Sequence, residues 1–188
     1  MKKIKILFLS LLLCSAAMAQ TDNYEIFAKN ITRIDTDSVS FDVYISRIGT
    51  DTVNLAGYDL TISFDYQACA NGGTVRVFYV PNSADTAGMP AKHKTPTILY
   101  DSTNAPGTFR MYVNNATYAT SKKIGSSTNG MTKLGKFKMR CTAHWVVGSK
   151  LSLHWENVKV LGYLNGSTSV TSLGRKHRNY VQGNTALN

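Results

Sequence analysis

SVSFDVYISRIGTDTVNLAGYDLTISFDY, residues Ser38–Tyr66, is the stretch that decides the fold, because apolar and polar side chains alternate along two parts of it. In Val39–Ile45 the odd-numbered residues are apolar, and in Tyr58–Tyr66 the even-numbered residues are apolar. A period of two is typical of a β-strand that buries one face. The stretch therefore predicts two strands, each of which turns one face toward a core.

Strand-like segments recur along the rest of the chain, separated by turn residues such as Asn, Gly and Pro. The further candidate strands are Tyr24–Ile34, Thr74–Val80, Thr97–Tyr100, Thr108–Val113, Lys133–Trp145, Leu151–Trp155 and Val158–Leu164. Ser121–Gly130 is expected to be a polar loop, and no helix of useful length is indicated after the first twenty residues. Two sheets with one apolar face each must bury those faces together, which predicts an all-β sandwich of about nine strands.

The N-terminus has the three parts of a secretory signal peptide: Lys2, Lys3 and Lys5, then the apolar run Ile6–Leu13, then Ala17-Met18-Ala19. We therefore expect residues 1–19 to be a signal peptide and residues 20–188 to form a single β-sandwich domain, secreted or at the cell surface, with the periplasm as the alternative destination. A lipid anchor on Cys14 is less favoured because Leu13 stands where a small residue is needed. No segment is long and apolar enough to span a membrane.

Two cysteines remain after the leader, Cys69 and Cys141. In an oxidising compartment an even number favours one disulfide, with two free thiols as the alternative. Closing the loop between Cys69 and Cys141 would add about 4 kcal/mol to the free energy of unfolding in the chain-entropy model. The alternation of its strand directs Cys141 inward.

The charge is unevenly distributed. Residues 20–101 hold ten acidic and six basic side chains, whereas residues 102–188 hold twelve basic side chains and one acid, Glu156. Lys136, Lys138 and Arg140 project from one strand face, and Arg110 is expected near them. Such a row could bind an acidic glycan, lipopolysaccharide or an acidic protein. The alternative is an edge strand that lysines protect against aggregation.

The alternation of side chains places the aromatic residues on different sides of their strands. Tyr44 and Tyr112 face the polar side of their strands and are candidates for stacking on sugar rings, whereas Trp145 and Trp155 share the apolar side and favour the core.

Catalysis is poorly supported, because no nucleophile elbow, zinc-protease motif or phosphate loop is present. His144 and His154 could meet on one sheet face and bind a metal, but surface histidines are the more common case. We therefore expect no enzyme activity, no cofactor and no metal, and we expect no nucleic-acid partner.

The strands of Ser38–Tyr66, followed by GMTKLGKFKMRC at Gly130–Cys141, resemble cohesin-like domains of secreted bacterial proteins, particularly those of Bacteroidetes with type IX secretion. The resemblance implies a jelly-roll β-sandwich, an architecture shared with carbohydrate-binding modules. It further implies a non-enzymatic module that binds a glycan or a protein partner at or outside the cell surface. The alternative function is a structural or adhesive subunit of an extracellular assembly.

Four tripeptides also resemble the O-glycosylation motif of Bacteroidetes, an Asp followed by Ser or Thr and a small or aliphatic residue. The residues that would carry the glycan are Ser38, Thr52, Thr86 and Ser102.

Overall fold

The computed structural model describes residues 22–85, 89–101, 103–126 and 128–176. In the described part the regular secondary structure is almost entirely strand, with one four-residue helix and two short 3-10 turns. The elements are β1 (Asp22–Arg33), β2 (Ser38–Arg47), β3 (Val53–Ser63), α2 (Tyr66–Cys69), β4 (Val75–Tyr79), η1 (Ala91–His93), β5 (Thr97–Tyr100), β6 (Thr108–Val113), η2 (Tyr118–Thr120), β7 (Lys122–Lys123), β8 (Thr132–Cys141), β9 (His154–Leu164), β10 (Thr171–Ser172) and β11 (Gly174–Arg175).

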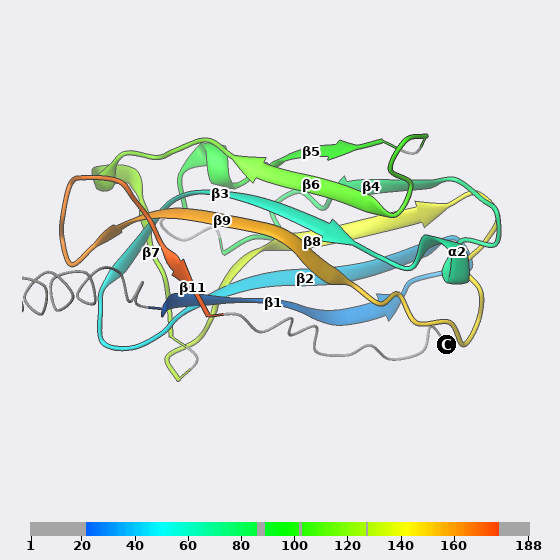
Figure 1. Cartoon of the computed structure of the whole chain (residues 1–188), viewed down its shortest axis with the longest axis horizontal. Coiled ribbons are helices and arrows are strands. Elements are labelled where there is room, and N and C mark those ends of the chain that lie inside the picture. Colours follow the sequence, from blue (N-terminus) through cyan, green and yellow to red (C-terminus); the bar gives the residue numbers. More distant parts are fainter. Residues whose placement is uncertain (1–21, 86–88, 102, 127, 177–188) are drawn as a thin grey trace, which may run out of the picture.

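The strands form two sheets that pack face to face as a jelly-roll sandwich. The first sheet has the order β11-β1-β2-β8-β4, and the second has the order β10-β9-β3-β6-β5, with β7 paired to β3. Figure 1 shows β9, β3, β6 and β5 running side by side across the molecule. Among the named strands of the described part, every pair is antiparallel except β1 with β11, and an isolated bridge between Arg47 and Ser126 is also parallel. The all-β jelly-roll prediction is therefore confirmed.

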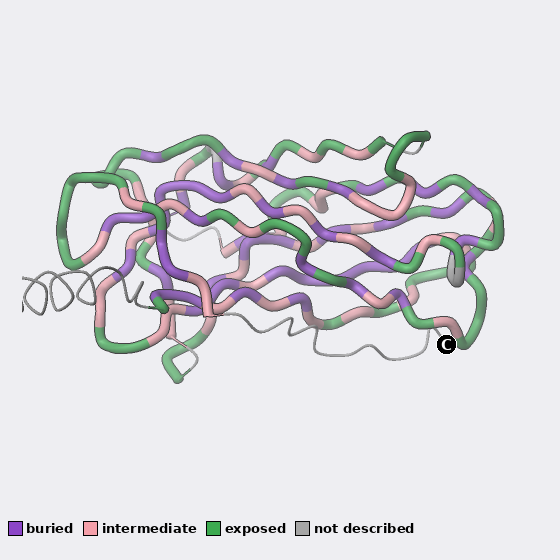
Figure 2. Tube along the Cα trace, viewed as in Figure 1, coloured by how far each residue is buried: buried purple, intermediate pink, exposed green. Residues whose placement is uncertain are grey.

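The core lies between the sheets and is centred on aromatic rings. Phe41 stacks on Phe137 with ring centroids 5.6 Å apart, and it meets Phe109 of the other sheet at 6.1 Å. Phe41, Phe137 and Ile62 are fully buried or nearly so, as their parity predicts. Figure 2 shows buried positions running through the strands while the connecting loops are largely exposed.

Several strand boundaries differ from those expected; the strand placed at Lys133–Trp145, for example, ends at Cys141. The strand placed at Tyr58–Tyr66 begins earlier, at Val53, and ends at Ser63. The end of the segment Leu151–Trp155 and the whole of Val158–Leu164 belong to one strand, β9, which begins at His154, because a bulge at Glu156 keeps the pairing with β3 intact. Within the expected polar loop, Lys122–Lys123 adds a short strand to the second sheet.

The strand with the cationic row, β8, is not an edge strand. It pairs with β2 on one side and with β4 on the other. Its lysines therefore do not serve to protect a sheet edge, and the edge interpretation is wrong. In the described residues, no helix is long and apolar enough to cross a membrane.

Candidate binding surfaces

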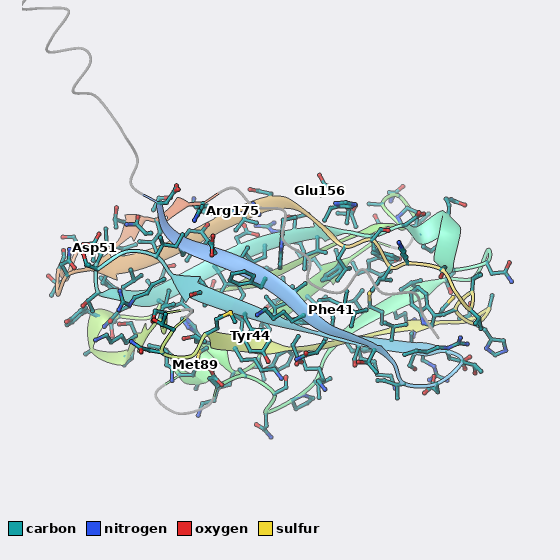
Figure 3. The ribbon with its side chains drawn as sticks, turned by 90° about the horizontal axis from the view of Figure 1, so that it is seen from below. Phe41, Tyr44, Asp51, Met89, Glu156 and Arg175 are labelled. Atoms are coloured by element: carbon teal, nitrogen blue, oxygen red, sulfur yellow. The ribbon has the colours of Figure 1, made fainter. Side chains whose placement is uncertain are left out.

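The structure distributes the six candidate ligand-binding residues over both outer faces of the sandwich. Tyr44, Lys136, Lys138 and Arg140 project from the first sheet, whereas Arg110 and Tyr112 project from β6 in the second. Figure 3 shows Tyr44 and the β9 residue Glu156 on opposite sides of the molecule. The expectation that Arg110 neighbours the cationic row is therefore wrong. The alternation of side chains shows on which face of its strand a residue lies, but it does not show to which sheet that strand belongs.

The second sheet carries an ion pair at the centre of its outer face. Arg110 donates from Nε to Oδ1 of Asp59 at 2.6 Å and from Nη2 to Oδ2 of the same carboxylate. This hydrogen bonding raises the pKa of Arg110. The guanidinium carbon also lies 5.3 Å from the ring centroid of Tyr112, so the cation is held from two sides. Arg110 thereby has both a carboxylate and an aromatic partner on this face.

Around this ion pair the outer face is mixed: Lys159 of β9 lies opposite Asp59 and Thr61 of β3 lies opposite Arg110, beside apolar and aromatic side chains. Strand register places Leu99 of β5 beside Arg110, and Tyr112 beside Asp59. Leu99 is 48% exposed. A hollow of about 160 Å³ opens next to Tyr112, and Leu161 of β9 forms part of its wall. We call the surface formed by Asp59, Leu99, Arg110, Tyr112 and Leu161 the Tyr112 face.

The first sheet carries the cations. Lys136, Lys138 and Arg140 alternate with the buried residues Phe137 and Met139, so all three point outward. Among the described residues none of these three cations forms an ion pair within 4.0 Å.

The neighbouring strand β4 adds to the same surface. Arg76 lies directly opposite Arg140, and Phe78, which is 45% exposed, lies opposite Lys138. We call the surface of Arg76, Lys136, Lys138 and Arg140 the basic face.

Tyr44 does not offer an open stacking surface. The ammonium group of Lys133 lies 5.8 Å from its ring centroid, and the same group forms a 2.9 Å ion pair with Asp42. Asn30 donates a 2.8 Å hydrogen bond to the other oxygen of Asp42. Although Asp42 faces outward by parity, it is buried, because β2 is a central strand flanked by the long side chains Lys29 and Lys136.

Both tryptophans are in the core, as expected. Trp155 lies on β9, whereas Trp145 follows β8 in a turn, where its indole N–H donates to the carbonyl of Asp37 at 2.8 Å.

Cys141 is also buried, and its thiol donates to the carbonyl of Ala70 at 3.3 Å. The side chain of Cys69, the residue before Ala70, is outside the described part. The disulfide stays a prediction, and the structure shows Cys141 as a free thiol.

The histidines occupy unrelated environments. His144 is exposed in the turn after β8 and pairs with Asp37, whereas His154 begins β9 in the other sheet. The described residues contain no group of three metal-ligating side chains. His93, which sequence reasoning passed over, is completely buried: its Nε2 lies 3.0 Å from the carbonyl of Ala56, and its Nδ1 has no hydrogen-bond partner. Burial lowers the pKa of His93.

Several carboxyl groups have lowered pKa values. A hydrogen bond from the backbone N–H of Asp37 lowers the pKa of Asp35, and one from His144 lowers the pKa of Asp37. A hydrogen bond from the backbone N–H of Asn104 lowers the pKa of Asp101. A glycosidase acid needs a raised pKa, so these three groups are unsuited to that role.

The candidate glycosylation residues differ in accessibility. Ser38 is buried, and Thr52 is half-buried where its backbone N–H donates to the side chain of Asn165 at 2.9 Å. Thr86 and Ser102 lie outside the described residues.

No family model matches the sequence, and no curated protein matches it. Solved structures do. The seventh ScaB type I cohesin from Pseudobacteroides cellulosolvens is similar with a TM-score of 0.55 and 10% identity, covering 83% of this chain and 88% of that one. The sixth cohesin of scaffoldin B from Acetivibrio cellulolyticus, solved in complex with a mutant Cel5 dockerin, is similar with a TM-score of 0.50 and 15% identity, covering 84% and 95%. The chain thus has the fold of cohesin modules.

Proposed function

We propose that this chain is a secreted, non-enzymatic module that binds a protein partner outside the cell through the Tyr112 face. The observation that carries the proposal is the composition of this face. The centres of protein interfaces are enriched in Tyr and Arg and depleted of Lys, and their binding energy is concentrated in a few such residues. The Tyr112 face has Tyr112 and Arg110 at its centre and a single lysine, Lys159, beside them, whereas the basic face consists of lysines and arginines.

Preorganisation supports the same assignment. The bidentate contact with Asp59 and the ring of Tyr112 restrain Arg110 in the chain on its own. Side chains that are already ordered lose little conformational entropy on binding. The similar cohesin from Acetivibrio cellulolyticus was solved in complex with a dockerin, which supports a protein as the kind of partner.

The test first identifies the partner and then measures its affinity for variants of the Tyr112 face. The exported chain, carrying a photo-crosslinker in place of Leu99, is used to identify proteins secreted by the same cells, and the identified partner is then titrated calorimetrically. Because truncating a central aromatic residue of an interface costs about 2 kcal/mol or more, Tyr112→Ala should weaken binding roughly 30-fold. Leu99→Asp should weaken it similarly, because a carboxylate would be buried.

Val147→Asp is the matched control, since Val147 is 68% exposed in the loop after β8 and lies on neither face. It should bind as the wild type does. If Tyr112→Ala and Leu99→Asp both kept the wild-type affinity, the Tyr112 face would not be the interface.

A further inference from the structure

The basic face holds concentrated positive charge that the fold itself does not require. Arg76 and Arg140 stand directly opposite each other on paired strands, an arrangement of like charges that destabilises a sheet. Lys138 lies between Arg140 and Lys136 on the same strand face. Their strand is central, so protection of an edge does not account for them.

Charge complementarity on this face is not satisfied within the described residues. Asp42 lies directly opposite Lys136 in the strand register, and Asp35 and Asp37 in the β1–β2 turn interact with Lys138 and Arg140 without forming ion pairs. Asp37 is already paired with His144. The buried Asp42 is neutralised by Lys133. The outward cations are therefore available to an external anion.

The spacing of the cations indicates the form of that anion. Alternate residues of a strand are about 6.6 Å apart, so Lys136 and Arg140 are separated by about 13 Å. An extended polypeptide presents its own alternate side chains on one side with the same repeat. Three acidic residues at every second position would each meet one cation, and the guanidinium of Arg76 would give the end of the row a second donor group beside Arg140.

We propose that the basic face binds an extended acidic segment of a protein, with carboxylates at alternating positions. The inference deepens the proposed function and rests on the chain being a protein-binding module, but it uses the opposite face. Because β8 is paired on both sides, its backbone groups are occupied and recognition is through side chains only. The exposed ring of Phe78 beside Lys138 offers an apolar contact to a residue between the acids.

The experiment titrates the isotope-labelled mature chain, followed by NMR, with three probes. The first is a five-residue peptide alternating Asp and Thr, the second has the same composition with its three Asp residues in one block, and the third is a polyuronate oligosaccharide. The alternating peptide should shift signals of β8 and β4 and bind at least threefold more tightly than the block peptide. Raising the salt from 0.05 M to 0.3 M should weaken it several-fold, because exposed charges are screened.

The double variant Lys136→Gln/Lys138→Gln should weaken the alternating peptide at least fivefold. The matched control Lys123→Gln/Lys150→Gln removes the same charge from exposed lysines outside the first sheet and should leave binding unchanged. Equal binding of the two peptides, an unaffected double variant, or binding of the polyuronate alone would each overturn the inference. Tyr112→Ala should bind the peptide normally, so failure of this face and failure of the Tyr112 face are distinguishable.

Discussion

Replacing His93 by Gln should reduce the loss of stability that we expect for this protein in mild acid. His93 is enclosed by the sandwich, with its ring edge against Tyr58 at a centroid distance of 6.3 Å. Both close partners of Nε2, the carbonyls of Ala56 and Asn114, are acceptors, so Nε2 carries the proton of the neutral ring. Protonation would add an N–H at Nδ1, where no acceptor is present.

The sign and size of the effect follow from linkage. Burial lowers the pKa of His93 in the folded state, so in the window below the unfolded value of about 6.5 the unfolded chain binds a proton that the folded chain does not. The stability contributed by the neutral ring is complete above that value and is lost as the pH falls toward the folded pKa. Between pH 7.5 and pH 5.5 the free energy of unfolding should fall by up to about 1.4 kcal/mol on account of this residue.

The assay is urea unfolding of wild type and His93→Gln, followed by tryptophan fluorescence at the two pH values. The variant is less stable at pH 7.5 because a buried site is altered, but its additional loss of stability at pH 5.5 should be smaller than that of the wild type. His154→Gln, at an exposed position, should keep the full wild-type loss. Equal acid-induced losses in wild type and His93→Gln would refute the reasoning.

Three further outcomes are expected. Phe41→Ala should reduce the free energy of unfolding by about 3–5 kcal/mol, measured by urea unfolding, because it opens a cavity between Phe137 and Phe109; a loss below 1 kcal/mol would contradict this packing. If Cys69 and Cys141 pair on export, thiol titration of the secreted, denatured chain without reductant should find no free cysteine, and one or two reactive thiols would exclude the bond. Peptide mapping of the glycosylated folded chain should find sugar on Thr52 and not on Ser38, whose side chain is buried, and the reverse result would show modification before folding.

The alternation of side chains was sufficient to predict the fold because the core is made of inward residues such as Phe41, Ile62 and Phe137, which each have polar neighbours in sequence. It could not place Arg110, since the side of a strand is a local property while the partner sheet depends on the path of the whole chain. The burial of Asp42 was missed for a related reason: the lysines that cover it come from other strands.

Only some residues of the two candidate surfaces could be predicted from the sequence. The row Lys136, Lys138 and Arg140 is visible in one strand, but Arg76 becomes its neighbour only through the pairing of β4 with β8. Asp59 and Arg110 lie far apart in sequence, and no local pattern links them. His93 lacks any motif, and only its enclosure by β3 and the segment after β6 makes it notable.

The parallel pairing of β1 with β11 has a practical consequence. Gly174 lies beside Asp22, and the backbone N–H of Lys176 donates to the carbonyl of Tyr24 at 3.0 Å, so the first and last described strands meet at one corner (Figure 1). Compact units whose ends emerge together tolerate insertion into a host loop or rejoining of their ends. We therefore expect that this sandwich can be inserted as a domain into a loop of another protein, with the outer faces of both sheets exposed to solvent.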